Sequence, residues 1–222
     1  MLFRLLRLLR ANKNRYGPAD EVACFEQLDD GLKEVTDPST LFRSTREGAI
    51  AGTCTAITLE GRRALLVELQ ALATVSPGNN PMRRTTGLDT TRAAMLVAVT
   101  ERAARLKLWD KDVYIATVAG AKVSDTGADL ALCLAVLSAA RDVAVPRDLT
   151  AIGEVALSGD VRPVPGMAQR VAEAARLGFT TVLIAKGSGA GIKVKGVRVV
   201  EVSRSEEHTS ELQSRLHLVC RL

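Results

Sequence analysis

The sequence predicts an α+β fold in which helices pack against a mixed sheet. Short β-branched runs alternate with longer helix-forming runs along most of the 222 residues. Some neighbouring strands are joined by turns typical of hairpins, whereas others are separated by a helix and need a crossover connection. A sheet with both kinds of connection contains antiparallel and parallel strands. Because 47% of the residues are hydrophobic, the chain has enough apolar surface for a substantial core.

The first predicted elements are strands. Residues 1–10, MLFRLLRLLR, place arginines among leucines, a pattern also found in targeting peptides and membrane-surface helices. The segment lacks an uninterrupted apolar run and a small-residue cleavage site, so a strand or strand end cut from a larger domain is favoured. Residues 21–35 then predict a hairpin that turns at Asp29-Asp30-Gly31.

A larger domain is expected to begin after residue 45. Residues 49–59 and 64–72 are β-rich and form a second predicted hairpin. The segment 74–86 contains two prolines and is predicted to be an irregular loop. A helix is predicted over 88–106, with Asp89 in its first turn, where the helix dipole favours a carboxylate.

The second half of this domain alternates strands with two more helices. The predicted helix 127–140 is apolar on nearly every side and should therefore be central. The predicted helix 166–177 ends at Gly178, a residue suited to the position after a helix. The remaining strands are expected over residues 112–118, 151–157, 182–185 and 197–202.

Charge and cysteine content exclude some classes of protein and leave others open. The net charge of +5 and the pI near 9.2 permit a nucleic-acid partner but are also common in ordinary globular proteins. The four cysteines are scattered without metal-ligand spacing, so no metal site is predicted and a reducing, cytoplasmic setting is expected. No apolar run approaches the roughly 20 residues of a membrane span, so no membrane partner is expected.

The C-terminal segment 204–222 has an unusual sequence. Its first eleven residues, Arg204 to Ser214, read RSEEHTSELQS, which resembles a translated short-read sequencing adapter. We therefore expect adapter read-through and disorder there, with a genuine polar helix as the alternative. Both histidines lie in this segment, so the rest of the chain has no histidine for acid/base chemistry or metal binding.

One motif resembles the catalytic turn of Lon-type Ser/Lys peptidases. Residues Gly153 to Arg170 read GEVALSGDVRPVPGMAQR, similar to the Lon segment in which such a turn leads into the helix with the catalytic lysine. Ala168 stands at the lysine position and Gly127 at the serine position. The resemblance implies the ribosomal protein S5 domain 2-like fold, the fold of the Lon C-terminal domain. A site without hydroxyl and base cannot form an acyl-enzyme, so no catalytic residue is predicted.

An active Lon-like Ser/Lys peptidase is the rival interpretation of this motif. Ser124 and Lys122 lie close to Gly127 in the sequence. Ser124, however, lies three residues before Gly127, the serine position of the motif, and is therefore expected in the loop before the helix.

Other segments resemble the bacterial RadA (Sms) family of recombination proteins. KNRYG, at Lys13 to Gly17, is similar to the family's KNRFG signature and is preceded by a matching LLRAN. The segment that follows it, GPADEVACFE, and the long run from Pro81 to Gly120 are also similar. Together these segments span nearly all of residues 8–203. The resemblance divides the chain into a remnant of a RecA-like ATPase domain at 1–45 and a catalytically dead Lon-like domain at 46–203.

The RadA resemblance implies a DNA-dependent ATPase that forms hexameric rings and drives branch migration in homologous recombination. Its partners would be DNA, further copies of itself and the recombination machinery. ATP, Mg and Zn belong to upstream parts of such proteins, so the chain is expected to begin in the last strands of the motor domain. Met1 would then mark a fragment boundary or a mispredicted start. No cofactor is predicted here, because the GSGAGIK segment at 187–193 lacks the ending of a phosphate-binding loop and is expected to be a plain loop.

Two sets of residues are candidates for a functional site. By resemblance, the KNRYG motif lies near a subunit interface, where cations reach a neighbour's nucleotide; its residues are Lys13, Asn14, Arg15, Tyr16 and Gly17. Arginines of the Lon-like domain are candidates for contacts to duplex phosphates: Arg62, Arg63, Arg83, Arg84 and Arg92. Aromatic residues are too few to favour base stacking. A purely structural oligomerisation domain is the remaining alternative.

Overall fold

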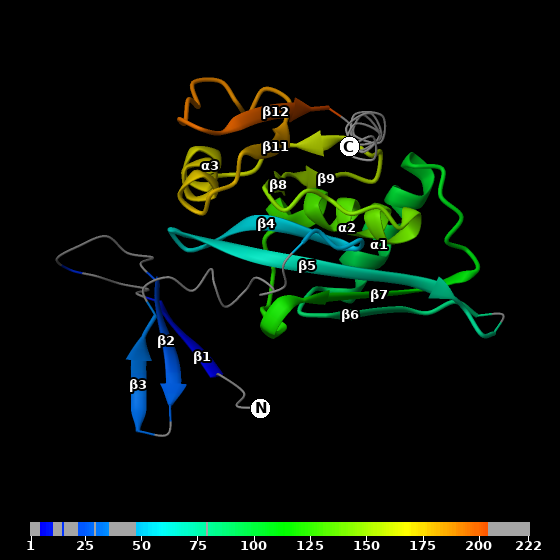
Figure 1. Cartoon of the computed structure of the whole chain (residues 1–222), viewed down its shortest axis with the longest axis horizontal. Coiled ribbons are helices and arrows are strands. Elements are labelled where there is room, and N and C mark those ends of the chain that lie inside the picture. Colours follow the sequence, from blue (N-terminus) through cyan, green and yellow to red (C-terminus); the bar gives the residue numbers. More distant parts are fainter. Residues whose placement is uncertain are drawn as a thin grey trace.

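The protein contains a small N-terminal sheet and a larger one. The computed structural model describes residues 5–10, 15, 22–28, 30–35, 48–78 and 80–203. The small sheet has strands β1 (Leu5–Arg10), β2 (Val22–Leu28) and β3 (Gly31–Glu34), all antiparallel (Figure 1). The expected N-terminal strand and the expected hairpin at 21–35 are therefore confirmed. Residues 204–222 lie outside the described part of the chain.

The larger sheet has seven strands in the order β12-β11-β8-β4-β5-β7-β6 (Figure 1). Their bounds are β4 (Thr53–Glu60), β5 (Arg63–Val75), β6 (Arg83–Thr86), β7 (Lys111–Thr117), β8 (Leu149–Ile152), β11 (Thr181–Ala185) and β12 (Arg198–Val202). The pairs β4–β5 and β5–β7 are antiparallel, and the other pairs are parallel. The predicted mixed sheet and the α+β class are thus confirmed.

Helices cover both faces of this sheet. Helix α1 (Thr90–Ala103) and helix α2 (Asp129–Arg141) share one hydrophobic core with the sheet, and helix α3 (Met167–Arg176) shares the other. The alternation of side chains along a strand separates the two cores, since successive residues point to opposite faces. On β8, for example, Ala151 contributes to the α1 and α2 core and Ile152 to the α3 core.

The helices follow the sequence prediction closely. Every residue of α2 from Asp129 to Ser138 is buried, as expected for a central helix. Asp89 is the N-cap of α1, where its carboxylate accepts a hydrogen bond from the amide of Arg92 at 2.7 Å. Helix α3 ends before Gly178, as predicted. No helix in the described ranges is long and apolar enough to cross a membrane.

Two parts of the strand prediction are wrong. The predicted loop at 74–86 contains the end of β5 and the whole edge strand β6, whose polar sequence Arg-Arg-Thr-Thr gives no buried pattern. The predicted strand at 151–157 is broken at Gly153, so that β9 (Glu154–Val155) pairs with β10 (Val161–Arg162) outside the large sheet. A Cβ atom at Gly153 would lie 2.7 Å from Cγ1 of Val161, so a larger residue there would require Val161 to shift.

Candidate functional site

The two halves of the Lon-like motif meet at Gly127 and Gly153. The carbonyl of Gly127 accepts a hydrogen bond from the amide of Gly153 at 3.0 Å, and the carbonyl of Gly153 accepts one from Leu130 at 3.1 Å. Gly127 lies in a short 3₁₀ turn (Thr126–Ala128) that leads into α2. These two hydrogen bonds fix the end of β8 against the start of α2. Gly127 lies next to a side chain of α3.

Arg170 of α3 fills the space in front of Gly127. A Cβ atom at Gly127 would lie 2.7 Å from Nη1 of Arg170 and 3.0 Å from Oδ1 of Asp125. The Arg170 side chain is only 2% exposed and donates to the carbonyls of Ile57 at 2.6 Å and Pro165 at 3.0 Å. The position where a serine nucleophile is expected is therefore occupied by a guanidinium group.

Asp125 is the ion-pair partner of Arg170. The two side chains approach to 2.6 Å between Oδ2 and Nη1. The Asp125 carboxylate also accepts hydrogen bonds from the amides of Leu59, at 2.7 Å, and Gly127, at 2.8 Å. Burial alone would raise the pKa of Asp125, but these donors together outweigh it and hold the pKa below its ordinary value. Through this ion pair and its hydrogen bonds, Asp125 and Arg170 connect β4, the 3₁₀ turn and α3.

The other residues considered for peptidase chemistry do not assemble. Ala168 is exposed on α3, and the α3 side chain that meets Gly127 is Arg170 instead. Ser124 and Lys122 are exposed in the loop before the 3₁₀ turn, as predicted for Ser124. Thr126 supplies a hydroxyl beside Gly127, and this hydroxyl donates to Oε2 of Glu154 at 3.2 Å.

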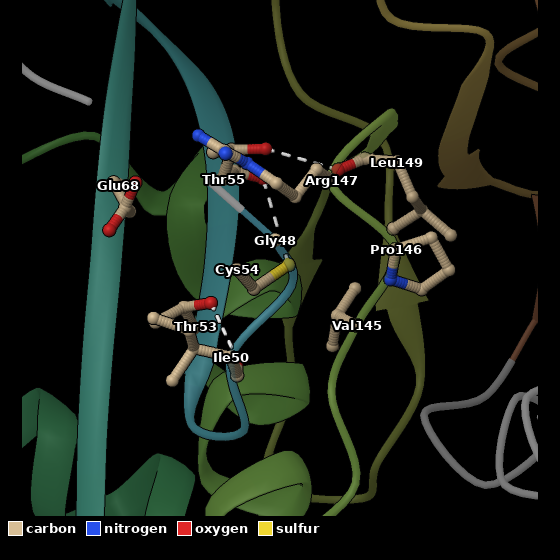
Figure 2. A pocket seen from close by; sticks show the side chains of 10 residues that line it. All are labelled: Gly48, Ile50, Thr53, Cys54, Thr55, Glu68, Val145, Pro146, Arg147 and Leu149. Atoms are coloured by element: carbon tan, nitrogen blue, oxygen red, sulfur yellow. Dashed lines mark hydrogen bonds between the residues drawn. The ribbon is translucent and has the colours of Figure 1, made fainter. Parts of the chain in front are cut away.

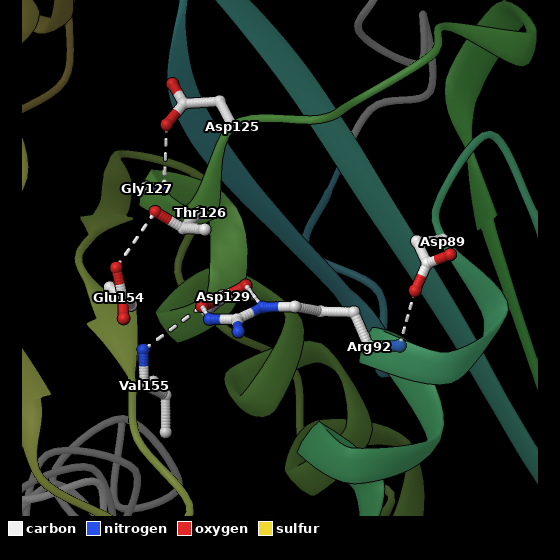
Figure 3. A network of polar contacts seen from close by, with 8 residues as sticks. All are labelled: Asp89, Arg92, Asp125, Thr126, Gly127, Asp129, Glu154 and Val155. Atoms are coloured by element: carbon white, nitrogen blue, oxygen red, sulfur yellow. Dashed lines mark hydrogen bonds and ion pairs between the residues drawn. The ribbon is translucent and has the colours of Figure 1, made fainter.

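A second polar network lies on the other side of the turn (Figure 3). Arg92 of α1 forms an ion pair with Asp129, donating from Nε at 3.2 Å and from Nη2. The amide of Val155 donates to the same carboxylate at 3.1 Å. Burial raises the pKa of Asp129, and the donors offset only part of this effect. A groove of about 400 Å³ next to this network is lined by side chains of α1 and by residues 154–158 and Arg162.

The predicted DNA-contact arginines have different surroundings. Arg83 donates to the carbonyls of Leu108, at 2.7 Å, and Lys111, and so holds a loop against β6. Arg92 is engaged with Asp129, as described above. Arg62 and Arg84 are exposed, and Arg63 is half-buried. The structure does not gather the five into one patch, and their contacts to DNA stay a prediction.

Arg84 lies on an open part of the sheet. It lines a hollow of about 650 Å³ over β5, β6 and β7, together with Leu72, Thr86 and Tyr114. Helix α3 packs on this face of the sheet against β4 and the first part of β5. The hollow therefore remains accessible beside an exposed cation.

A further pocket beside β4 and β8 is too small for a ligand (Figure 2). Its volume of about 30 Å³ has room for about one water molecule. Its threonines are satisfied by backbone groups: Thr55 donates to Leu149 at 3.1 Å and Thr53 donates to Ile50 at 2.8 Å. This pocket is a feature of strand packing.

Neither a metal centre nor a phosphate loop is evident in the described parts of the chain. Among these residues, no cluster of three or more His, Cys, Asp and Glu side chains is arranged to hold a metal ion. The 187–193 segment forms turns, as predicted for a plain loop. The amides of Gly187 and Gly189 donate to the Glu201 carboxylate and lower its pKa. Amides that could face a phosphate therefore hold the chain's own carboxylate.

The KNRYG motif falls almost entirely outside the described residues. Lys13, Asn14, Tyr16 and Gly17 are not described, and Arg15 is exposed. Its expected role at a subunit interface stays a prediction.

The sequence analysis missed Arg170 and Asp125. The buried residues of α3, Met167, Arg170, Val171 and Ala174, follow the three- and four-residue spacing of one helix face. That spacing could have shown that Arg170 points inward. Asp125 gave no comparable signal, because its partner lies on a helix that is distant in the sequence.

Comparison with known proteins gives one partial family match and several close relatives. Residues 97–188 match the family model "Subunit ChlI of Mg-chelatase", which covers less than half of the chain. The chain is 46% identical over 192 residues to DNA repair protein RadA of Mycolicibacterium smegmatis, covering 85% of this chain and 41% of that protein. It is 44% identical over 202 residues to RadA of Pseudomonas aeruginosa, covering 91% of this chain and 45% of that protein.

RadA of Escherichia coli is 41% identical over 197 residues, which cover 86% of this chain and 43% of that protein. The chain thus spans less than half the length of these curated relatives. Over the part of their length that it matches, the chain belongs with the RadA DNA repair proteins.

Proposed function

We propose that this chain is the DNA-contacting and ring-assembling part of a RadA-type repair protein. In this proposal its larger domain has the ribosomal protein S5 domain 2-like fold of the Lon peptidases but has no peptidase activity. The observation that carries the proposal is the Arg170–Asp125 ion pair in front of Gly127, in a chain related to DNA repair proteins. In this proposal the fold contributes its shape and its charged surface to DNA binding and ring assembly.

The same contacts support the proposed absence of peptidase activity. An acyl-enzyme needs a hydroxyl or thiol nucleophile activated by a base. Gly127 has neither, and Arg170 leaves no room for a side chain there. The cationic Arg170 also cannot accept a proton, since a guanidinium stays charged at all ordinary pH values.

Contacts to duplex DNA are proposed at exposed arginines. Phosphate binding needs accessible cations and carries little sequence information. Arg62 and Arg84 meet this requirement, whereas Arg83 and Arg92 already bind partners within the chain. The similarity to DNA repair proteins supports DNA as the polyanion.

The remaining activities are proposed for the longer relatives as whole proteins. These are assembly into hexameric rings, ATP-driven branch migration and work with the recombination machinery. Among the described residues, the amide of Gly189 in the glycine-rich loop donates to Glu201, and no group of three or more His, Cys, Asp and Glu side chains is arranged to hold a metal ion. Those cofactors would bind elsewhere in the longer protein.

A peptidase assay separates this proposal from an active Lon-like enzyme. The full chain should release no fluorophore from fluorogenic peptides, and the variant with Gly127→Ser and Ala168→Lys should not either. The side chain added by Gly127→Ser would meet Arg170, so the dyad could not form without removing the ion pair. Turnover by the wild type that is lost on Ser124→Ala or Lys122→Ala would overturn the proposal.

Neighbouring arginines on β6 provide a matched pair for the DNA interaction. Arg84→Ala should leave thermal stability unchanged and lower the salt slope of duplex affinity by about 1, the effect of one phosphate contact. Arg83→Ala should instead lower the free energy of unfolding by about 1–3 kcal/mol, because the partly buried carbonyls of Leu108 and Lys111 each lose one hydrogen bond. Fluorescence anisotropy with a labelled duplex and urea unfolding measure the two quantities. A purely structural oligomerisation domain predicts self-association without salt-sensitive DNA affinity.

A further inference from the structure

A set of cations that the sequence analysis did not select lies on the connection between β11 and β12. In this connection apolar and basic residues alternate: Ile192 and Val194 pack against the α3 core, while Lys193 and Lys195 are exposed. Because Ile192 and Val194 pack inward, the connection is anchored to the core while both lysines remain exposed to solvent.

Two more exposed cations lie at the ends of the same connection. Lys186 directly follows β11, and Arg198 is the first residue of β12. Because the two strands are parallel, Arg198 lies beside Thr181, at the start of β11. The length of β11 places the backbones of Lys186 and Arg198 roughly 16 Å apart, at about 3.3 Å per residue. We call Lys186, Lys193, Lys195 and Arg198 the crossover cations.

The crossover cations lie on a segment with few acidic residues, and the exposed Asp148 near Arg198 accepts a hydrogen bond from Thr180. The one acidic residue between positions 181 and 203 is Glu201. Its carboxylate is held by loop amides, and among the four cations Lys186 alone contributes to lowering its pKa. No salt bridge joins Lys193, Lys195 or Arg198 to another residue within the described ranges. The positive charge of these exposed side chains is therefore available to a ligand outside the chain.

We infer that the crossover cations form a second contact surface for the phosphate backbone of duplex DNA. The cations are spread along about 16 Å of surface, over which a duplex presents many phosphates at about one charge per 1.7 Å. Flexible lysines on an open connection suit a repeating polyanion, whereas a small phosphate ligand would need a shaped pocket. The aromatic ring in this region, Phe179, is buried, so base stacking is not available there.

This surface is separate from the one at Arg84. Strands β12 and β6 are the two edges of the seven-stranded sheet. Six strand spacings of about 4.8 Å place these edges about 29 Å apart. The chain thus presents cations at both edges of the sheet. A contact between Arg84 and a DNA phosphate would leave the crossover cations free to contact other phosphates.

The inference rests on the proposed DNA binding and is tested with the full chain. The variant K186Q/K193Q/K195Q/R198Q removes the crossover cations. Its matched control, K33Q/R105Q/K107Q/K122Q, removes the same net charge from exposed positions on other surfaces. Duplex affinity is measured by fluorescence anisotropy over a range of salt concentrations, and circular dichroism melts check that both variants fold.

The crossover variant should lose at least about tenfold in duplex affinity at low salt, and its salt slope should fall by about 3–4, close to 0.9 for each phosphate contact. The control should keep most of the wild-type slope. Equal slopes for the two variants, with a wild type that binds DNA, would overturn this inference and leave the proposed function standing. A wild type without salt-sensitive DNA affinity would overturn both.

Discussion

Arg170 and Asp125 occupy the space in front of Gly127, the position that the Lon resemblance assigns to the serine. That resemblance placed Gly127 and Ala168 at the positions of the Lon dyad from the sequence alone. The contact between Arg170 and Asp125 could not be predicted from the sequence, because it depends on the packing of α3 against the turn before α2. A buried charge is tolerated there because carbonyls and a carboxylate satisfy its donors.

Breaking the Arg170–Asp125 pair should destabilise the fold strongly. Arg170→Met leaves Asp125 without its counter-charge and should lower the free energy of unfolding by about 3–5 kcal/mol. The matched control is Arg176→Met on the exposed face of the same helix, where the pair with Glu173 should contribute at most about 1 kcal/mol. Adding Asp125→Asn to Arg170→Met should cost much less than the two single changes combined. Urea unfolding gives all four values, and equal losses for Arg170→Met and Arg176→Met would contradict this account.

The pair also predicts the response of stability to acid. Because the pKa of Asp125 is lowered in the folded protein, its contribution is complete above the ordinary carboxyl pKa near 4. The contribution is lost as the pH falls through the lower folded value. The stability difference between wild type and Asp125→Asn should therefore shrink from about pH 5 toward about pH 2. Urea titrations at several pH values measure it, and a difference independent of pH would speak against a charged Asp125.

At the scale of elements, the helices were easier to predict than the short strands. Helices α1, α2 and α3 have long apolar patterns, so their ends were predicted within a few residues. Strands β6, β9 and β10 have only two to four residues, too few for a clear pattern, and β6 pairs with β7 more than twenty residues away. The break at Gly153, after which β9 pairs with β10 instead of continuing β8, is not revealed by any local pattern.

The core between the large sheet and α2 contains two cysteines that test how tightly these elements pack. Cys54 on β4 and Cys133 on α2 are buried, and burial raises the pKa of each thiol to about 12. Since the thiolate is the reactive form, neither should be alkylated by iodoacetamide at pH 8 in the native protein. Both should react after unfolding in urea. Peptide mapping by mass spectrometry measures this, and rapid alkylation of Cys133 without denaturant would show that α2 opens locally.

At the scale of the molecule, the sequence predicted the mixed sheet but not its strand order. The order places cations at both edges of the sheet, although Arg84 and the crossover cations are about a hundred residues apart in the chain. The arginines were predicted from their charge alone, whereas Arg83 binds a backbone carbonyl and Arg92 a carboxylate within the protein. Which basic side chains are exposed and which have partners within the protein could be determined only from the structure.

The most direct test of the central claim is the salt dependence of duplex DNA binding by the wild-type full chain. We predict that the logarithm of the association constant falls linearly with the logarithm of the salt concentration, with a slope of about −0.9 for each phosphate contacted. Contacts at both edges of the sheet should give a slope of about −4 or steeper. Absence of binding, or an affinity that does not change with salt, would contradict a role of this domain in holding DNA.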